Sequence, residues 1–211
     1  MLKPYKLVPA LKNYIWGGSS LTEKYNIKSD YEKTAEAWVL SAHADGSSDF
    51  SDGRSFKEYI NENPDAVGRK AQNFDNFPML IKLIDACDNL SVQVHPDDAY
   101  ALENEGEYGK TEMWYVADCT EDAFLYYGFN KDITEEEFSM RIKNNTVTEI
   151  LNRVKVKKGD TFFISAGTVH AIGAGILYVK FSKIQILHIV FTTTTEGTKT
   201  ETQENFILTK H

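Results

Sequence analysis

The stretch Leu90–Val116, LSVQVHPDDAYALENEGEYGKTEMWYV, decides the fold when it is read together with Gly159–His170, GDTFFISAGTVH. Apolar and β-branched residues alternate up to His95, which predicts a strand whose alternate side chains share one face. Gln93 and His95 therefore point the same way. Pro96 ends the strand, because proline has no N–H to donate to the ladder. A strand that ends in two possible metal ligands is a good half-site.

Two further donors come from separate predicted strands. Glu112 lies in a predicted strand over 111–117, on the same face as Trp114, and His170 follows a loop of small residues after the apolar strand 161–164. Imidazole, carboxylate and amide oxygen together suit zinc with an open position, although manganese or iron would also fit. Either histidine taken alone is better explained as an ordinary surface or core residue. The predicted ligands of one divalent metal are Gln93, His95, Glu112 and His170.

The same motifs carry a family resemblance. The spacing from Gly159 through Ser165 and Gly167 to His170 resembles the second cupin motif, with Ser165 where that family usually has proline. The runs FPMLIKLIDACDNLSVQVHPDD, GKTEMWYV, YIWGG and TAEAWVLSAHADGSS resemble type I mannose-6-phosphate isomerase (phosphomannose isomerase), in its short bacterial form, over roughly 7–177. The resemblance implies a mainly β fold, a cupin-type jelly-roll β-sandwich with a helical insertion. It also implies one Zn²⁺ per chain and a small sugar phosphate as substrate.

The reaction implied by the resemblance interconverts mannose 6-phosphate and fructose 6-phosphate through an enediol. Such an isomerase needs a Lewis acid, a proton donor and acceptor near neutral pH, and cations for the phosphate. Lys110 stands two residues before Glu112, and a neighbouring divalent cation would lower the pKa of this lysine. We therefore predict that Lys110 is an acid/base or substrate-orienting residue. The alternative is a solvated loop lysine.

Three other residues are candidates for contact with the substrate. Lys82 interrupts an otherwise apolar predicted strand over 78–86, where a lysine must reach a pocket or extend to water; the resemblance implies that it faces the substrate. Ser91 shares the face of Gln93 and is a candidate for contact with phosphate or a sugar hydroxyl. Trp16 is a candidate aromatic wall, with a half-buried packing residue as the alternative.

Two other function classes remain open. One is a non-catalytic cupin fragment that binds metal or sugar. The other is a different cupin enzyme, such as an iron oxygenase, that uses the same four ligands. Metal identity separates the oxygenase from an isomerase, because an oxygenase needs redox-active iron whereas zinc suffices for isomerisation.

Composition limits the remaining possibilities. The 211 residues fit one domain, or one and a fraction, and a formal charge of −8 argues against nucleic acid or an anionic membrane as the main partner. No apolar run is long enough to span a bilayer, and the first residues lack the apolar core of a signal peptide. Cys87 and Cys119 are expected to be reduced thiols. We expect a cytoplasmic monomer.

Local signals predict many short strands and a few helices. Strands are predicted over 5–12, at a sheet edge because of Pro9, and over 34–42 and 123–129. An acidic helix is predicted over 97–105. Capping boxes open further predicted helices near 20–23, 55–62, 134–144 and 146–153.

The sequence changes character after Leu177. From Val179 onward there is no proline, aspartate, arginine or tryptophan, and Thr192–Thr195 is a homopolymer run. The resembled family continues here with a segment like CEIQQNSNTTYRVYDYNRRD, and back-translation of this chain one nucleotide earlier can encode that segment. We therefore predict a catalytic domain over 1–177, followed by an out-of-frame tail over 178–211.

The predicted frameshift has functional consequences. The tail would replace the closing strands and the second cupin-like domain of the family, and the family's Arg-x-x-Asp segment would be lost. We expect impaired turnover, poor packing, and opportunistic pairing of the apolar segment Ile184–Thr192 at an open sheet edge.

Overall fold

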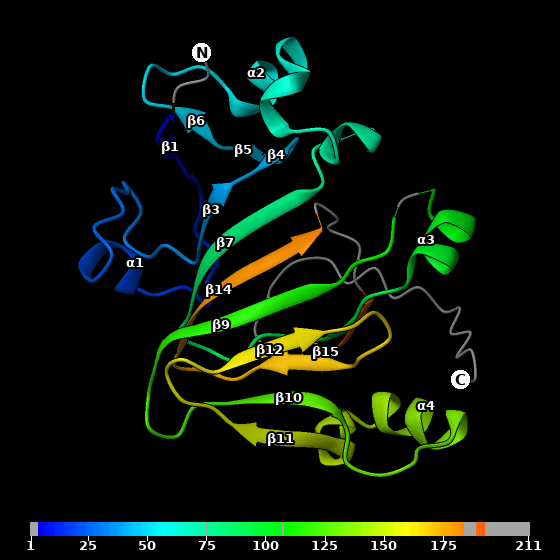
Figure 1. The fold of residues 1–211 in the computed structure, drawn as a ribbon. Helices are drawn as coiled ribbons and strands as arrows, with labels where there is room; N and C mark the ends of the chain where they lie inside the picture. The colour runs from blue at the N-terminus through cyan, green and yellow to red at the C-terminus, as the bar shows by residue number, and fades with distance from the viewer. Residues whose placement is uncertain (1–3, 75, 107, 184–188, 193–211) are drawn as a thin grey trace.

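Two antiparallel sheets form a β-sandwich in the computed structural model, which describes residues 4–74, 76–106, 108–183 and 189–192 (Figure 1). The six-stranded sheet has the order β12 (Thr161–Ile164), β9 (Glu112–Cys119), β14 (Ile176–Lys183), β7 (Met79–Ala86), β3 (Glu36–Leu40) and β2 (Ala10–Lys12). The five-stranded sheet has the order β11 (Leu151–Lys155), β10 (Phe124–Phe129), β13 (His170–Ile172), β8 (Val92–Val94) and β15 (Ile189–Thr192). Two small ribbons pair β1 (Leu7–Val8) with β6 (Asp49–Phe50), and β4 (Ala42–His43) with β5 (Gly46–Ser47).

The main hydrophobic core lies between the two sheets. Ile84, Trp114 and Tyr178 come from the six-stranded sheet, and Leu125 and Ile172 come from the five-stranded sheet; each is at most 5% exposed. Alternate residues of each strand face this core because side chains alternate across a strand. The sandwich predicted from the sequence is confirmed.

The described part of the chain contains four short helices outside the sheets: α1 (Ser20–Glu23), α2 (Phe56–Glu62), α3 (Asp98–Asn104) and α4 (Glu135–Lys143). Three 3-10 turns accompany them within the same residues: η1 (Pro64–Val67), η2 (Ala71–Asn73) and η3 (Val147–Ile150). The caps predicted at Ser55 and Thr134 are present, since each hydroxyl accepts from the backbone N–H three residues later. Phe138 of α4 packs into a second core cluster beside the five-stranded sheet. The segment between β10 and β11 is therefore the helical insertion.

Three local predictions need correction. The capping box predicted at Ser20 does not form, because Ser20 is the first residue of α1, its N-cap position is Ser19, and the Ser19 side chain makes no cap bond. The helix predicted over 146–153 is wrong: the Thr146 side chain makes no cap bond to η3, and Leu151–Lys155 is strand β11. Pairing with β10 outweighs the capping signal, because it satisfies the backbone of β11 and buries Leu151. The strand predicted over 5–12 is divided by Pro9 into β1 and β2, and β2 lies at a sheet edge as expected.

Strand β14 crosses the domain boundary predicted at residue 177. It pairs with β7 from Ile176 to Lys183 and with β9 as far as Ser182, with a register shift between Leu177 and Tyr178 on the β9 side. Further on, β15 pairs with β8 at the edge of the five-stranded sheet, where edge pairing was expected, whereas residues 184–188 lie outside the described part. The out-of-frame origin of the tail stays a prediction.

Within the described ranges, no helix has both the length and the apolar character needed to cross a membrane.

Candidate metal centre

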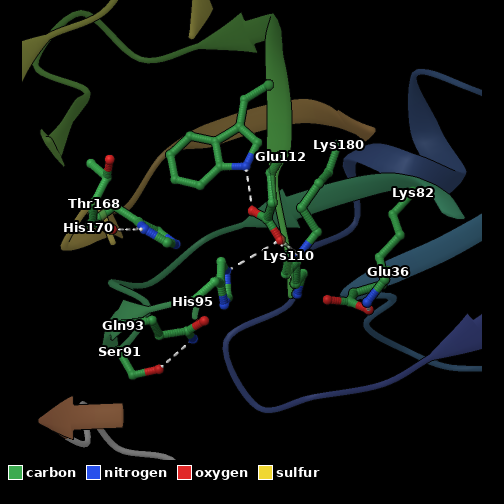
Figure 2. A network of polar contacts seen from close by, with 11 residues as sticks. Glu36, Lys82, Ser91, Gln93, His95, Lys110, Glu112, Thr168, His170 and Lys180 are labelled. Carbon is green, nitrogen blue, oxygen red and sulfur yellow. Dashed lines mark hydrogen bonds and ion pairs between the residues drawn. The ribbon is translucent and has the colours of Figure 1, made fainter. Parts of the chain in front are cut away.

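The predicted ligands come from both sheets and meet between them (Figure 2). Gln93 on β8 lies directly opposite His170 on β13 in the antiparallel register. His95 follows one residue after β8 ends, and Glu112 is the first residue of β9. The period-two argument therefore placed Gln93 and His95 correctly, and strand pairing supplies His170.

Three of these side chains converge closely. The possible ligand atoms of His95, Glu112 and His170 all lie within 4.8 Å of one another, and the three residues are 1%, 2% and 3% exposed. The two imidazole rings are 4.9 Å apart between centroids, and His95 Nε2 lies 3.4 Å from Glu112 Oε1. A buried group of two imidazoles and one carboxylate is a donor set that suits zinc.

Surrounding hydrogen bonds orient these donors. His170 Nδ1 is 2.8 Å from the carbonyl oxygen of Thr168, so a proton on Nδ1 leaves the Nε2 lone pair free to bind a cation. Trp114 Nε1 donates to Glu112 Oε2 at 2.8 Å, which leaves Oε1 facing the histidines. Gln93 Nε2 donates to Ser91 Oγ at 2.8 Å, which leaves the amide oxygen of Gln93 as a possible fourth ligand. The residues present therefore fit a divalent cation.

Burial and charge keep the donors in their metal-binding protonation states. Burial lowers the pKa of His95 to about 3 and also lowers the pKa of His170, so both imidazoles are neutral at pH 7. Burial alone would raise the pKa of Glu112, but the charges of Lys180 and Lys110 hold that pKa well below its ordinary range. Neutral imidazoles beside an ionised carboxylate are what a cation requires.

A pocket of about 590 Å³ opens onto the cluster. Every predicted site residue except His95, which is buried behind it, contributes to its lining: Trp16, Lys82, Ser91, Gln93, Lys110, Glu112 and His170. Trp16 stacks on Tyr14, with 5.4 Å between ring centroids, and its indole N–H has no hydrogen-bond partner among the described residues. Gly17 holds this turn against the sheet, since a Cβ there would lie 2.6 Å from Ala35 Cα. Trp16 therefore contributes an aromatic wall to the pocket, and its indole N–H is buried.

Backbone contacts fix Lys110 beside the cluster. The Lys110 N–H donates to the carbonyl of Pro96 at 3.0 Å, which ties this loop to the end of the His95 segment. Gly109 permits the approach, because a Cβ there would lie 2.2 Å from the carbonyl carbon of Asp97. Lys110 Nζ is 2.9 Å from Glu112 Oε1, and burial lowers the pKa of this lysine. Lys110 is thus a buried pocket residue and not a solvated one.

Lys82 also reaches the pocket and does not extend to water. Its Nζ is 2.9 Å from Glu36 Oε2 and 4.1 Å from the centroid of Trp38, and burial lowers its pKa to about 8. All eight predicted residues are therefore brought to one site, and the role of each stays a prediction.

Among the lining residues that sequence reasoning missed, Glu36 and Lys180 form ion pairs with the predicted site, since Glu36 pairs with Lys82 and Lys180 with Glu112. For Glu36 a signal existed: Glu36-Ala-Trp38 repeats the pattern of Glu112-Met-Trp114, and in both the indole N–H donates to the glutamate. Lys180 had no usable signal, because it lies beyond the predicted boundary at residue 177.

Comparisons with known proteins agree with this geometry. The family described as "Phosphomannose isomerase type I, catalytic domain" matches residues 5–118, more than half of the chain. Mannose-6-phosphate isomerase ManA of Bacillus subtilis is 42% identical over 181 residues, which are 83% of this chain and 56% of that protein. The probable mannose-6-phosphate isomerase GmuF of the same organism is 39% identical over 188 residues, which are 87% of this chain and 59% of that protein.

A solved structure is also similar to this chain. The crystal structure of the mannose 6-phosphate isomerase from Bacillus subtilis superposes with a TM-score of 0.84 at 35% identity, covering 90% of this chain and 61% of that one. The chain thus spans between 56% and 61% of the length of these three proteins. With a catalytic-domain match over more than half of its length, the chain belongs to the type I phosphomannose isomerase family.

Proposed function

We propose that this chain binds one Zn²⁺ through His95, Glu112, His170 and the amide oxygen of Gln93. The support is the convergence of three buried donors within 4.8 Å, together with the hydrogen bonds that orient His170 and Gln93. Zinc suits this mixture of imidazole and carboxylate, and the side of the cluster that faces the pocket leaves room for a substrate oxygen.

We further propose that the pocket interconverts mannose 6-phosphate and fructose 6-phosphate. The observation that carries this proposal is the buried donor cluster of two imidazoles and one carboxylate in the wall of a pocket of about 590 Å³. Four lysines also line this pocket, Lys12, Lys82, Lys110 and Lys180. The names of the relatives point to the same reaction. When bound, a divalent metal supplies Lewis-acid polarisation of the carbonyl and hydroxyl oxygens at C1 and C2.

The residues of the chain supply the remaining chemistry. Lys110 is the proposed proton carrier, because its pKa is lowered by burial and a lysine with a lowered pKa can give and take a proton closer to neutral pH. Lys82 and Ser91 are proposed to contact the phosphate or the sugar hydroxyls, and Trp16 is proposed to pack against the sugar ring. Lys110 holds its place by its backbone bond to Pro96, so its Nζ is positioned before substrate enters.

We propose that turnover of the 211-residue chain is low. The family's Arg-x-x-Asp segment is absent from the predicted out-of-frame region, and one charge-assisted contact to phosphate contributes about 1.5–3 kcal/mol. Loss of one such contact would lower the rate by roughly ten- to a hundredfold.

The test combines metal analysis with an isomerase assay. We expect one zinc per purified chain, slow conversion of mannose 6-phosphate, and loss of both properties in His95→Ala. Lys110→Met should lose conversion but keep the zinc. A version with the reading frame restored should be much faster; equal turnover from both forms would show that residues 178–211 are native.

Other outcomes assign the chain to the alternative classes. Zinc without conversion, in either form, would identify a non-catalytic metal-binding protein. Stoichiometric iron with oxygen consumption would identify an oxygenase. Zinc retained in His95→Ala would exclude the proposed centre.

A further inference from the structure

One oxygen atom of the metal centre already faces two ammonium groups and one imidazole. Glu112 Oε1 lies 2.9 Å from Lys110 Nζ, 3.4 Å from Lys180 Nζ and 3.4 Å from His95 Nε2. Figure 2 shows Lys180 extending from its strand toward Glu112, beside Lys110. The atom that would bind a cation is therefore already held by ammonium groups of the chain.

The position of Lys180 in the sheet is electrostatically unusual. In the register of β14, Lys180 lies directly opposite Lys82 on β7 and Trp114 on β9. Like charges directly opposite one another destabilise a sheet. Three carboxylates line the pocket, Glu36, Asp45 and Glu112. Glu36 is already paired with Lys82, and the Asp45 side chain is 66% exposed. Glu112 is therefore the carboxylate left for Lys180, whose side chain is only 14% exposed.

A bound dication would have to share Glu112 with this ammonium group. Lys180 is close to Oε1 and poorly exposed, so water screens its charge only weakly. Lys110 is held beside the centre by its backbone bond to Pro96. Lys180 projects from the middle of β14, and its ammonium group donates no hydrogen bond to another described residue. Its charge opposes a metal without contributing a ligand.

We propose that the Lys180 ammonium is an internal competitor of the metal, which weakens metal binding at the centre formed by His95, Glu112 and His170. Removal of this one charge should therefore tighten metal binding without any change in the ligands. The inference rests on the metal centre proposed above. It concerns an affinity, so it can be tested without isomerase activity.

The experiment measures the zinc dissociation constant of the full chain by competition with a chromophoric chelator. Lys180→Met should bind zinc at least about tenfold more tightly than the unaltered chain, because a unit charge a few ångströms away at an effective dielectric constant near 20 is worth more than a tenfold change. Lys183→Met is the matched control. It removes a lysine from the same strand, but Lys183 is paired with Asp98 at 2.8 Å, away from the pocket lining.

A second readout uses heat. Without metal, Lys180→Met should melt at a lower temperature than the unaltered chain, because Glu112 loses a cationic neighbour. With saturating zinc the same variant should gain more in melting temperature than the unaltered chain gains. A merely structural role for Lys180 would lower both melting temperatures equally.

Each outcome of these measurements either supports or overturns the proposed competition between Lys180 and the metal. Affinity of Lys180→Met within about threefold of the unaltered chain, or equal tightening in Lys183→Met, overturns the inference while leaving the metal centre intact. Absence of zinc binding in every variant overturns the metal centre as well. If Lys180→Met fails to fold, Lys180→Arg decides, since it keeps the charge: unchanged weak affinity is expected, and tighter binding would refute competition.

Discussion

Glu36 and Glu112 are two buried glutamates of the six-stranded sheet with the same local sequence and different surroundings. Each is followed two residues later by a tryptophan whose indole N–H donates to its Oε2, at 2.5 Å for Trp38 and 2.8 Å for Trp114. On Glu36 the same oxygen also pairs with Lys82 at 2.9 Å. On Glu112 the other oxygen faces histidine and lysine side chains.

The difference shows that the facing sheet, and not the Glu-x-Trp pattern, decides what each carboxylate can do. Glu36 has a lysine from the neighbouring strand of its own sheet and forms a closed ion pair that stacks on Trp38. Glu112 lies opposite the five-stranded sheet where it delivers His170, close to the His95 segment. The first carboxylate supports the pocket wall, and the second is available to a metal.

The largest expected effect separates the two carboxylates directly. Glu112→Gln should weaken zinc binding by more than about a hundredfold, because it removes a ligand charge, and even outer partners of metal ligands are worth ten- to a hundredfold. Glu36→Gln should change the zinc dissociation constant by less than about threefold. Equal losses in both variants, measured by chelator competition, would mean that the two sites are not distinct.

A smaller effect is expected when the closed pair is broken. Lys82→Met leaves Glu36 buried without its cation, which should lower the free energy of unfolding in urea by about 3–5 kcal/mol. The control is Lys131→Met, because Lys131 pairs with Glu137 in solvent and such pairs contribute at most about 1 kcal/mol. A loss below about 1 kcal/mol for Lys82→Met would show that the Glu36 pair is no more important than a surface contact.

The smallest expected effect is a pH dependence of the free energy of unfolding, caused by Lys82, the partner of Glu36. Burial lowers the folded-state pKa of Lys82 to about 8 from an ordinary value of 10.5. Between these two pH values the unfolded chain binds the extra proton, so this lysine makes stability rise with pH by at most about 1.4 kcal/mol per unit. From pH 8 to pH 10, the unfolding free energy of the unaltered chain should therefore increase relative to that of Lys82→Met. If the difference between the two unfolding free energies stayed constant over this pH range, the pKa of Lys82 would not be lowered in the folded chain.

Local periodicity in the sequence was sufficient to predict the relative positions of some residues of the candidate metal centre. Alternation before Pro96 placed Gln93 and His95 on one face, and the short distance in sequence from Lys110 to Glu112 brought their side chains together. Such relations span a few residues and depend only on strand geometry. The two-sheet architecture followed from the same short alternating segments and from the motifs of the resembled family.

Other features depend on pairing between distant segments. The side chain of Glu36 faces the pocket only because Glu36 pairs opposite Ile84. The direction of the Lys180 side chain is fixed in the same way by the pairing of β14 with both β7 and β9. A one-residue slip would turn either side chain to the opposite face, so the sequence of one strand cannot fix them. The capping box at Thr146 predicted a helix wrongly for the same reason, because Leu151 pairs with Phe129 of the distant strand β10.

The central place of β14 also governs the order in which the sheet can be assembled. Ile176 pairs with Ala86 and with Cys119, so each pairing must first close a long loop of its own, and such closures slow folding. Until then β7 has only β3 beside it and β9 has only β12. A nascent chain that ends before Ile176 therefore carries two half-sheets, each with an open edge, and open edges invite association with other chains. Synthesis as far as Lys183 is the step that joins the halves and closes both edges.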